Sequence, residues 1–223
     1  EMAALEQCYE SVDYVSLHKY HTAPEGDIAN YLNASSVFED FIRTSIATCD
    51  YLQTKIRTPK KMYISFDEYG VSFGQQGEVL FGRRGWQDVT KSYSQFRPRE
   101  NTFRKTDPTG SDMNMRRRPR MSQMLSALAT ASILLTFLRH ADRIKIGCMT
   151  GGISSAVAFD REKTWRNASY YPYAQLNQLS RGAVSLMPAI DSPTYNTEQY
   201  ALSDSCQCYA YEDVQSIESA VVH

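Results

Sequence analysis

The spacing of hydrophobic residues changes several times along the chain, and these changes predict alternating strands and helices. Residues 12–17 are short, β-branched and aromatic, and a polar stretch follows them, which indicates a strand. From Ser36 the apolar positions recur every three or four residues, as in a helix, until Pro59 ends the pattern. Ser36 and Glu39 have the spacing of a capping box, which predicts that this helix begins there.

The same alternation then repeats. We predict a second strand over residues 62–67, a long apolar helix over 122–140, a third strand over 143–149 and a shorter helix over 172–180 that starts at a proline. The region 70–120 is irregular and much longer than an ordinary βα loop, so we expect it to be functional. Strand–helix order of this kind predicts parallel βα units in an α/β fold.

The number of βα units bears on the domain organisation. Three units cannot close a barrel that needs eight, and three parallel strands make a poor free-standing sheet. After Gly182 the pattern changes to short β-type pieces separated by Pro and Asn. We therefore predict that residues 1–181 are the C-terminal part of a (β/α)₈ TIM barrel, and that residues 182–223 begin an all-β domain. The chain opens with Glu1 and no export signal, and we expect a piece of a longer protein.

Charge and composition narrow the possible partners. The chain has 24 Lys and Arg against 25 Asp and Glu, and this balance gives no field that favours nucleic acid or anionic lipid. No apolar run reaches the roughly 18 residues of a membrane span. Five cysteines without metal-ligand spacing predict unpaired thiols, and we expect no metal and no cofactor. The basic run 116–120 is interpreted as a solvated turn before a helix. His140 and Asp142 are expected to make structural hydrogen bonds.

Polar residues gather at the predicted strand ends, where βα barrels carry their chemistry. His18 and Tyr20 follow the first strand, and Asp67 and Glu68 end the second. Because adjacent strand residues point to opposite sides, we expect only one of the two carboxylates to face a pocket. A two-carboxylate glycosidase would then need a partner from another strand. Two solvated carboxylates that end a strand are the alternative interpretation.

Several blocks of the chain carry a resemblance to a known family. They stand in a characteristic order: Tyr14-Val15-Ser16-Leu17-His18-Lys19-Tyr20, Ile64-Ser65-Phe66-Asp67-Glu68-Tyr69-Gly70-Val71, residues 137–146, Tyr170-Tyr171-Pro172-Tyr173 and Ser180-Arg181-Gly182. Together they resemble the α-L-arabinofuranosidases of glycoside hydrolase family 51 over nearly the whole chain. Residues 74–114 are the least similar part.

The resemblance implies both a fold and an activity. It implies a (β/α)₈ barrel, with about strands six to eight present here, followed by a β-sandwich, and retaining hydrolysis of terminal α-L-arabinofuranosyl groups. Glu68 matches the catalytic nucleophile, and His18 and Tyr20 match residues that contact the sugar and the nucleophile. The general acid/base is a Glu that follows an Asn, and we expect it upstream of Glu1, so the chain alone should be inactive. The implied partner is an arabinofuranosyl-containing oligosaccharide or polysaccharide. Whether the full-length protein forms homo-oligomers is left open.

This chain also departs from the family pattern. Tyr69 stands where the family usually has Trp, and we assign it to substrate binding. Ser72 replaces a common aromatic residue, and Gly151 and Ser154 stand where Gln and Asn are common. These changes leave open the same mechanism with another specificity, such as a β-xylosidase or β-glucanase. A non-catalytic carbohydrate-binding or structural fragment is a further alternative, and the sequence does not specify the glycan or the compartment.

Overall fold

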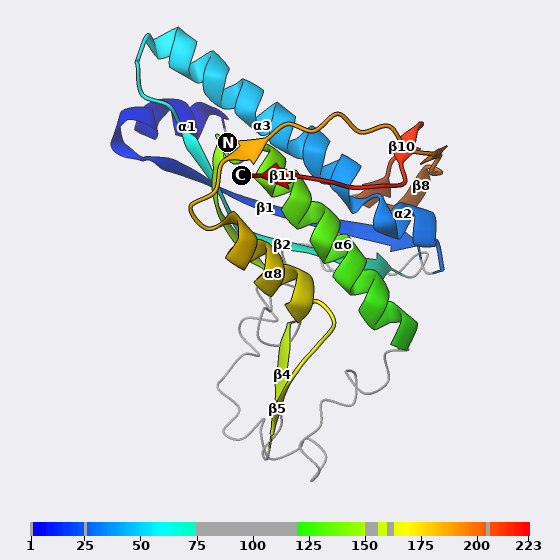
Figure 1. Cartoon of the computed structure of the whole chain (residues 1–223). Helices are drawn as coiled ribbons and strands as arrows, with labels where there is room; N and C mark the ends of the chain where they lie inside the picture. Colours follow the sequence, from blue (N-terminus) through cyan, green and yellow to red (C-terminus); the bar gives the residue numbers. More distant parts are fainter. Residues whose placement is uncertain (1, 25, 75–119, 150–155, 160–162, 204–205) are drawn as a thin grey trace, which may run out of the picture.

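A parallel three-stranded sheet forms the centre of the molecule (Figure 1). The computed structural model describes residues 2–24, 26–74, 120–149, 156–159, 163–203 and 206–223. The strands lie in the order β1-β2-β3 and are β1 (Tyr14–Pro24), β2 (Tyr63–Gly74) and β3 (Ile144–Met149). Both β1–β2 and β2–β3 pair in parallel, so the predicted α/β organisation of this region is confirmed.

Two long helices, α3 (Ala34–Ile56) and α6 (Arg120–Arg139), connect these strands and cover the same face of the sheet (Figure 1). The opposite face, which we call the open face, carries side chains that are strongly exposed, including Tyr14, Tyr20 and Ile146. A sheet with one covered face presents two different chemical surfaces along each strand, because successive side chains alternate.

Aromatic rings fill the space between the sheet and the helices. Phe137 of α6 stacks on Phe66 of β2 with ring centroids 4.8 Å apart, and Phe38 of α3 meets Tyr69 edge-on at 6.3 Å. Burial of each such side chain stabilises the fold by about 1.5–3 kcal/mol. Gly147 of β3 makes this packing possible, because a Cβ there would lie only 3.1 Å from the Phe137 ring.

Several predicted boundaries differ from the structure. The second strand, predicted over residues 62–67, runs from Tyr63 to Gly74. The first strand is longer than predicted, because the polar residues after Leu17 continue the ladder and place alternate side chains on the open face. The capping box at Ser36 and Glu39 is wrong: α3 begins at Ala34 with Asn33 as its N-cap, and no side chain caps it. Glu39 instead contacts Arg43 and His140, the residue directly after α6, as described below.

The remaining helices are short. They are α1 (Met2–Cys8), the 3-10 helix η1 (Tyr9–Ser11), α2 (Ile28–Leu32) and α8 (Tyr170–Ser180). Helix α8 begins two residues before Pro172, which was predicted to open it. Proline is tolerated there because the first turn of a helix needs no hydrogen bond from that backbone nitrogen.

Short antiparallel pairs make up the rest of the described chain. They are β4 (Val157–Phe159) with β5 (Thr164–Arg166), β6 (Ser185–Leu186) with β11 (Val221–Val222), β7 (Thr194–Tyr195) with β10 (Val214–Gln215), and β8 (Tyr200–Ser203) with β9 (Cys206–Cys208). The predicted β character after Gly182 is confirmed, whereas the boundary between 1–181 and 182–223 stays a prediction. This C-terminal segment crosses the outer side of the helices (Figure 1).

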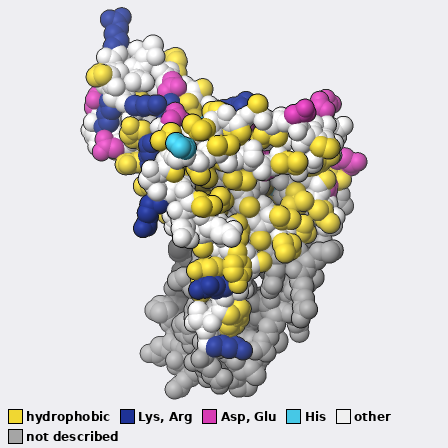
Figure 2. All heavy atoms as spheres, in the orientation of Figure 1, with side chains coloured by type: hydrophobic (Ala, Val, Ile, Leu, Met, Phe, Trp, Pro, Cys, Tyr) yellow, Lys and Arg dark blue, Asp and Glu magenta, His cyan; other side chains and the backbone are white. Residues whose placement is uncertain are grey.

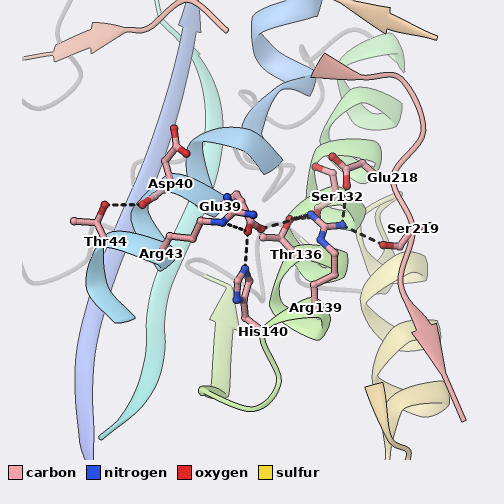
Figure 3. A network of polar contacts seen from close by, with 10 residues as sticks. All are labelled: Glu39, Asp40, Arg43, Thr44, Ser132, Thr136, Arg139, His140, Glu218 and Ser219. Carbon is pink, nitrogen blue, oxygen red and sulfur yellow. Dashed lines mark hydrogen bonds and ion pairs between the residues drawn. The ribbon is translucent and has the colours of Figure 1, made fainter. Parts of the chain in front are cut away.

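A group of polar side chains, which we call the helix-side network, ties the C-terminal segment to both long helices (Figure 3). Glu39 of α3 accepts hydrogen bonds from Arg43 at 2.7 Å and from His140 at 2.8 Å. Arg139 of α6 donates to Glu218 at 2.9 Å. The prediction that His140 makes a structural hydrogen bond is confirmed, and Asp142 forms an ion pair with Lys61 at 3.5 Å.

The surface of the helix side is partly apolar. Figure 2 shows hydrophobic side chains spread across this face. The exposed large hydrophobic residues of the molecule include Leu179, Val184, Met187 and Ile217. Within the described ranges, no helix is long and apolar enough to cross a membrane. Most of the irregular region 70–120, the basic run 116–120 and the departures at Gly151 and Ser154 lie outside the described residues, as does the side chain of Ser72.

Candidate active site

A β-bulge in β2 shapes the site. In the ladder between β1 and β2, Leu17 pairs with Phe66 and His18 pairs with Glu68, so Asp67 has no partner in β1. The ladder between β2 and β3 shifts in the same stretch, where β2 again carries one residue more than its neighbour. An extra residue of this kind interrupts the two-residue alternation of a strand and re-aims the side chains that follow.

The bulge brings both carboxylates to the open face. Asp67 and Glu68 each contact side chains of Ser16, His18 or Tyr20, which alternate along β1 and therefore share one face. The expectation that only one of the two carboxylates faces this side is wrong. It relied on regular alternation, and the bulge removes that regularity between Phe66 and Glu68.

The contacts run as a chain across the two strands. The Ser16 hydroxyl donates to Asp67 Oδ1 at 2.7 Å, and His18 Nε2 lies 3.3 Å from Asp67 Oδ2. The other ring nitrogen of His18, Nδ1, lies 3.6 Å from Glu68 Oε2. The Tyr20 hydroxyl donates to the same Glu68 oxygen at 2.8 Å. We call these five residues the open-face network; His18, Tyr20 and Glu68, proposed from sequence, are brought together in it.

The open-face network is accessible and electrostatically ordered. The side chains of His18, Asp67 and Glu68 are 50%, 46% and 45% exposed, so a ligand can reach all three. The hydrogen bond from Ser16 lowers the pKa of Asp67 below its ordinary value; the contact with His18 acts in the same direction, and partial desolvation opposes both. Asp67 is therefore ionised at neutral pH and can accept a hydrogen bond from His18.

A glycine helps to place the Tyr20 ring. Tyr20 pairs with Gly70 across the strands, and a Cβ at Gly70 would stand 3.4 Å from two atoms of that ring. The ring can thus lie over β2, with its hydroxyl directed at Glu68. Aromatic side chains commonly cover glycines on a neighbouring strand in this way.

Tyr69, which we assigned to substrate binding, lies elsewhere. Its side chain is buried on the helix-covered face, where the ring meets Phe38 and Phe137 edge-on. Burial raises the pKa of its phenol well above the ordinary value, and the hydroxyl finds no hydrogen-bond partner among the described residues. The structure therefore separates Tyr69 from His18, Tyr20 and Glu68.

Sequence reasoning missed two members of the open-face network. Ser16 could have been found, because it stands two residues before His18 and four before Tyr20 and so shares their face. That Asp67 shares this face with Glu68 depends on the bulge, for which the sequence offers no clear signal. Among the residues that the structure describes, no group of three or more His, Cys, Asp or Glu side chains could hold a metal ion.

The fold and the site define a class: an α/β protein with a parallel sheet that carries carboxylate, imidazole and phenol groups on its open face. Residues 67–221, more than half of the chain, match the family described as "Alpha-L-arabinofuranosidase C-terminal domain". The chain belongs to this family of α-L-arabinofuranosidases.

Known proteins resemble the chain over its whole length. It is 32% identical to an intracellular exo-alpha-(1->5)-L-arabinofuranosidase of Acetivibrio thermocellus and 31% identical to such an enzyme of Bacillus subtilis. Each alignment covers 100% of this chain but 38% of the relative. A family 51 alpha-L-arabinofuranosidase from Bifidobacterium longum shares the fold, with a TM-score of 0.66 and 22% identity over 98% of this chain and 40% of that one. The chain thus spans less than half the length of these proteins.

Proposed function

We propose that this chain contributes the nucleophile to a retaining α-L-arabinofuranosidase and that Glu68 is that nucleophile. The observation that carries the proposal is the hydrogen bond from the Tyr20 hydroxyl to Glu68 Oε2, 2.8 Å long, on an accessible face of a parallel sheet. A donor on one carboxylate oxygen fixes the orientation of the group that would attack the sugar.

The proposed reaction proceeds in two displacements. Glu68 attacks the anomeric carbon of a terminal α-L-arabinofuranosyl group and forms a covalent glycosyl–enzyme ester, while the leaving oxygen takes a proton from a general acid. The same acid, now a base, then removes a proton from water, which attacks the anomeric carbon and releases arabinose with retained configuration. His18 and Tyr20 orient Glu68 in both steps and contact the sugar.

The general acid/base is proposed to come from another strand of a (β/α)₈ barrel in a longer polypeptide, which continues into a β-sandwich. The lengths of the relatives support a longer polypeptide, because each relative is more than twice as long as the segment of it that aligns with this chain. Asp67 is a poor candidate for the acid. The His18 ring contacts both Asp67 and Glu68 and so stands between them, where a sugar would have to bind. We therefore expect the 223-residue chain alone to lack useful turnover.

The substrate class is proposed to be arabinofuranosyl-containing oligosaccharides or polysaccharides. The relatives named as exo-alpha-(1->5)-L-arabinofuranosidases support this class, and a β-xylosidase or β-glucanase with the same mechanism is the alternative. A panel of aryl glycosides separates the two. Preferential turnover of the aryl β-xyloside or β-glucoside would favour the alternative.

Replacement of Glu68 by Ala in the full-length protein tests the mechanism. We expect kcat to fall by roughly 10⁴-fold or more, as for other catalytic nucleophiles. Azide should enter the vacated space and partly restore turnover of an aryl arabinofuranoside, with a glycosyl azide of inverted configuration as the product. Asp142→Ala is the matched control, because Asp142 is an exposed carboxylate paired only with Lys61 in the described ion pairs. Near-normal kcat in Glu68→Ala would refute the assignment.

A further inference from the structure

The bulge in β2 raises the question of what a second carboxylate does on the open face. Asp67 follows Phe66, which is buried against the helices, so regular alternation would place Asp67 on the open face and turn Glu68 towards the helices. The bulge keeps Glu68 on the open face as well, next to an Asp67 that contacts Ser16 and His18. Bulges next to active sites commonly re-aim a side chain, and here the result is two carboxylates on one face, so the contacts of Asp67 indicate its use.

Each oxygen of Asp67 has a separate partner. Oδ1 accepts the Ser16 hydroxyl at 2.7 Å, which fixes the carboxylate, and Oδ2 lies 3.3 Å from His18 Nε2. An ionised carboxylate can only accept, so Nε2 must carry the proton of this contact. The opposite nitrogen, Nδ1, then faces Glu68 Oε2 at 3.6 Å. A partner on one ring nitrogen sets the orientation of an imidazole and the role of its other nitrogen.

We infer that Asp67 is a positioning residue that acts through His18. Held by Ser16, it orients the imidazole, so that the opposite ring nitrogen, Nδ1, faces the carboxylate of Glu68. This inference rests on the proposed function, in which Glu68 attacks the sugar, and adds a role for a residue outside the proposed reacting groups. Ser16 supports the arrangement as the anchor of Asp67.

The described surroundings of His18 support this arrangement. Among the residues that the structure describes, the titratable groups that face it are Asp67 and Glu68 from β2 and Tyr20, two residues away on β1. Its neighbours along β1 lie on the other face: Lys19 stands over the Phe41 ring, and His21 is buried and donates to the backbone of Asn30 at 2.7 Å. From β3, Lys145 stands over the Tyr63 ring, near the start of β2. Within the part of the chain that the structure describes, the two carboxylates of β2 are therefore the charged groups in contact with His18.

The inference is tested by kinetics of Asp67→Asn in the full-length enzyme. Asn keeps the shape but loses the charge, so kcat should fall by roughly 10- to 100-fold, as for other partners that orient a functional histidine. KM should change little. Ser16→Ala should act in the same direction with a smaller effect.

A second readout does not depend on turnover. In spectra of the protein labelled with ¹⁵N-histidine, the ring nitrogens of His18, assigned by loss of their signals in His18→Gln, should shift in Asp67→Asn and stay unchanged in the control Asp142→Asn. A purely structural role would predict a lower unfolding midpoint with unchanged ring signals, and that result would overturn the inference. Near-normal kcat in Glu68→Ala would refute the proposed function itself, whereas wild-type kinetics of Asp67→Asn beside an inactive Glu68→Ala would refute only the role of Asp67.

Discussion

Two networks in this molecule use the same chemical groups in different surroundings. The open-face network and the helix-side network each place a histidine against a carboxylate. In the first, the side chains of His18, Asp67 and Glu68 are about half exposed. In the second, His140, Glu39 and Arg139 are only 15%, 20% and 14% exposed, because α3, α6 and the C-terminal segment enclose them (Figure 3).

The difference in burial indicates a difference in role. Charges that are shielded from water interact strongly, and removing one partner leaves the others unpaired in a poor environment. Charges that are half exposed add little to stability but remain available to a ligand. We therefore expect the helix-side network to stabilise the fold and the open-face network to serve the reaction. Substitutions in each network can test this division.

Among substitutions in the two networks, the largest effect on stability is expected from Arg139→Met. Arg139 donates to Glu218, to the backbone of Ser219 and to Thr136, so it joins α6 to the C-terminal segment. Its loss should lower the free energy of unfolding by about 2–3 kcal/mol, somewhat less than for a fully buried pair. Denaturant unfolding measures this loss, and activity per folded molecule should stay unchanged.

The matched control for that substitution is Arg43→Met. Arg43 pairs with Glu39, which also lies 3.9 Å from Arg139, but the side chain of Arg43 is 71% exposed. Exposed pairs within one helix contribute about 0.3–0.5 kcal/mol, so the control should unfold nearly as the wild type does. Equal losses in the two variants would contradict the division between the networks.

Tyr20→Phe should show the reverse pattern. The substitution removes only the hydroxyl that donates to Glu68 at 2.8 Å and keeps the ring that lies over Gly70. A hydrogen bond to a charged group is worth about 1.5–3 kcal/mol, so kcat/KM of the full-length enzyme should fall roughly 10- to 100-fold. The unfolding midpoint should not change. A large loss of stability with normal kinetics would assign Tyr20 to the fold instead.

A smaller effect is expected for Glu39→Gln, on the decrease of the unfolding free energy at acid pH. Burial acts to raise the pKa of Glu39, but the contacts with His140 and Arg43 outweigh it, and the net pKa is lowered. A carboxyl whose pKa is lower in the folded state stabilises the protein above its unfolded value, near 4.5, and this stability is lost as the pH falls through the folded pKa. Glu39→Gln should flatten the fall in unfolding free energy below about pH 4.5. An unchanged decrease at acid pH would contradict this prediction.

The sequence predicted the regular parts of this fold and missed the irregular ones. Apolar spacing located all three strands of the sheet and both long helices, because one face of each element is buried. It ended the first and the second strand too early. In β1, the polar residues of the second half lie on the open face and carry no apolar signal. The bulge at Asp67 was also beyond such reasoning, since the pairing of three strands determines it.

The same bulge accounts for the placement of Tyr69. The substitution Tyr69→Phe, for which we predict the smallest effect, tests this placement. After the extra residue, the alternation resumes with Tyr69 towards the helices, where its ring meets Phe38 and Phe137. Its hydroxyl has no hydrogen-bond partner among the described residues. A buried polar group without a partner costs free energy, so Tyr69→Phe should leave stability unchanged or raise it by up to about 1 kcal/mol.

Kinetics of the same variant decide between packing and substrate binding. If Tyr69 only packs, KM and kcat for an aryl arabinofuranoside should equal those of the wild type within about twofold. The change in activation free energy should then be far below the roughly 1.4 kcal/mol that corresponds to a tenfold change in rate. Tyr69→Ala is the companion variant. It should destabilise the core by about 3–5 kcal/mol, as large-to-small aromatic substitutions do, which verifies that the ring is buried. A raised KM in Tyr69→Phe with unchanged stability would instead return Tyr69 to the substrate, and would mean that its hydroxyl reaches the open face when a sugar binds.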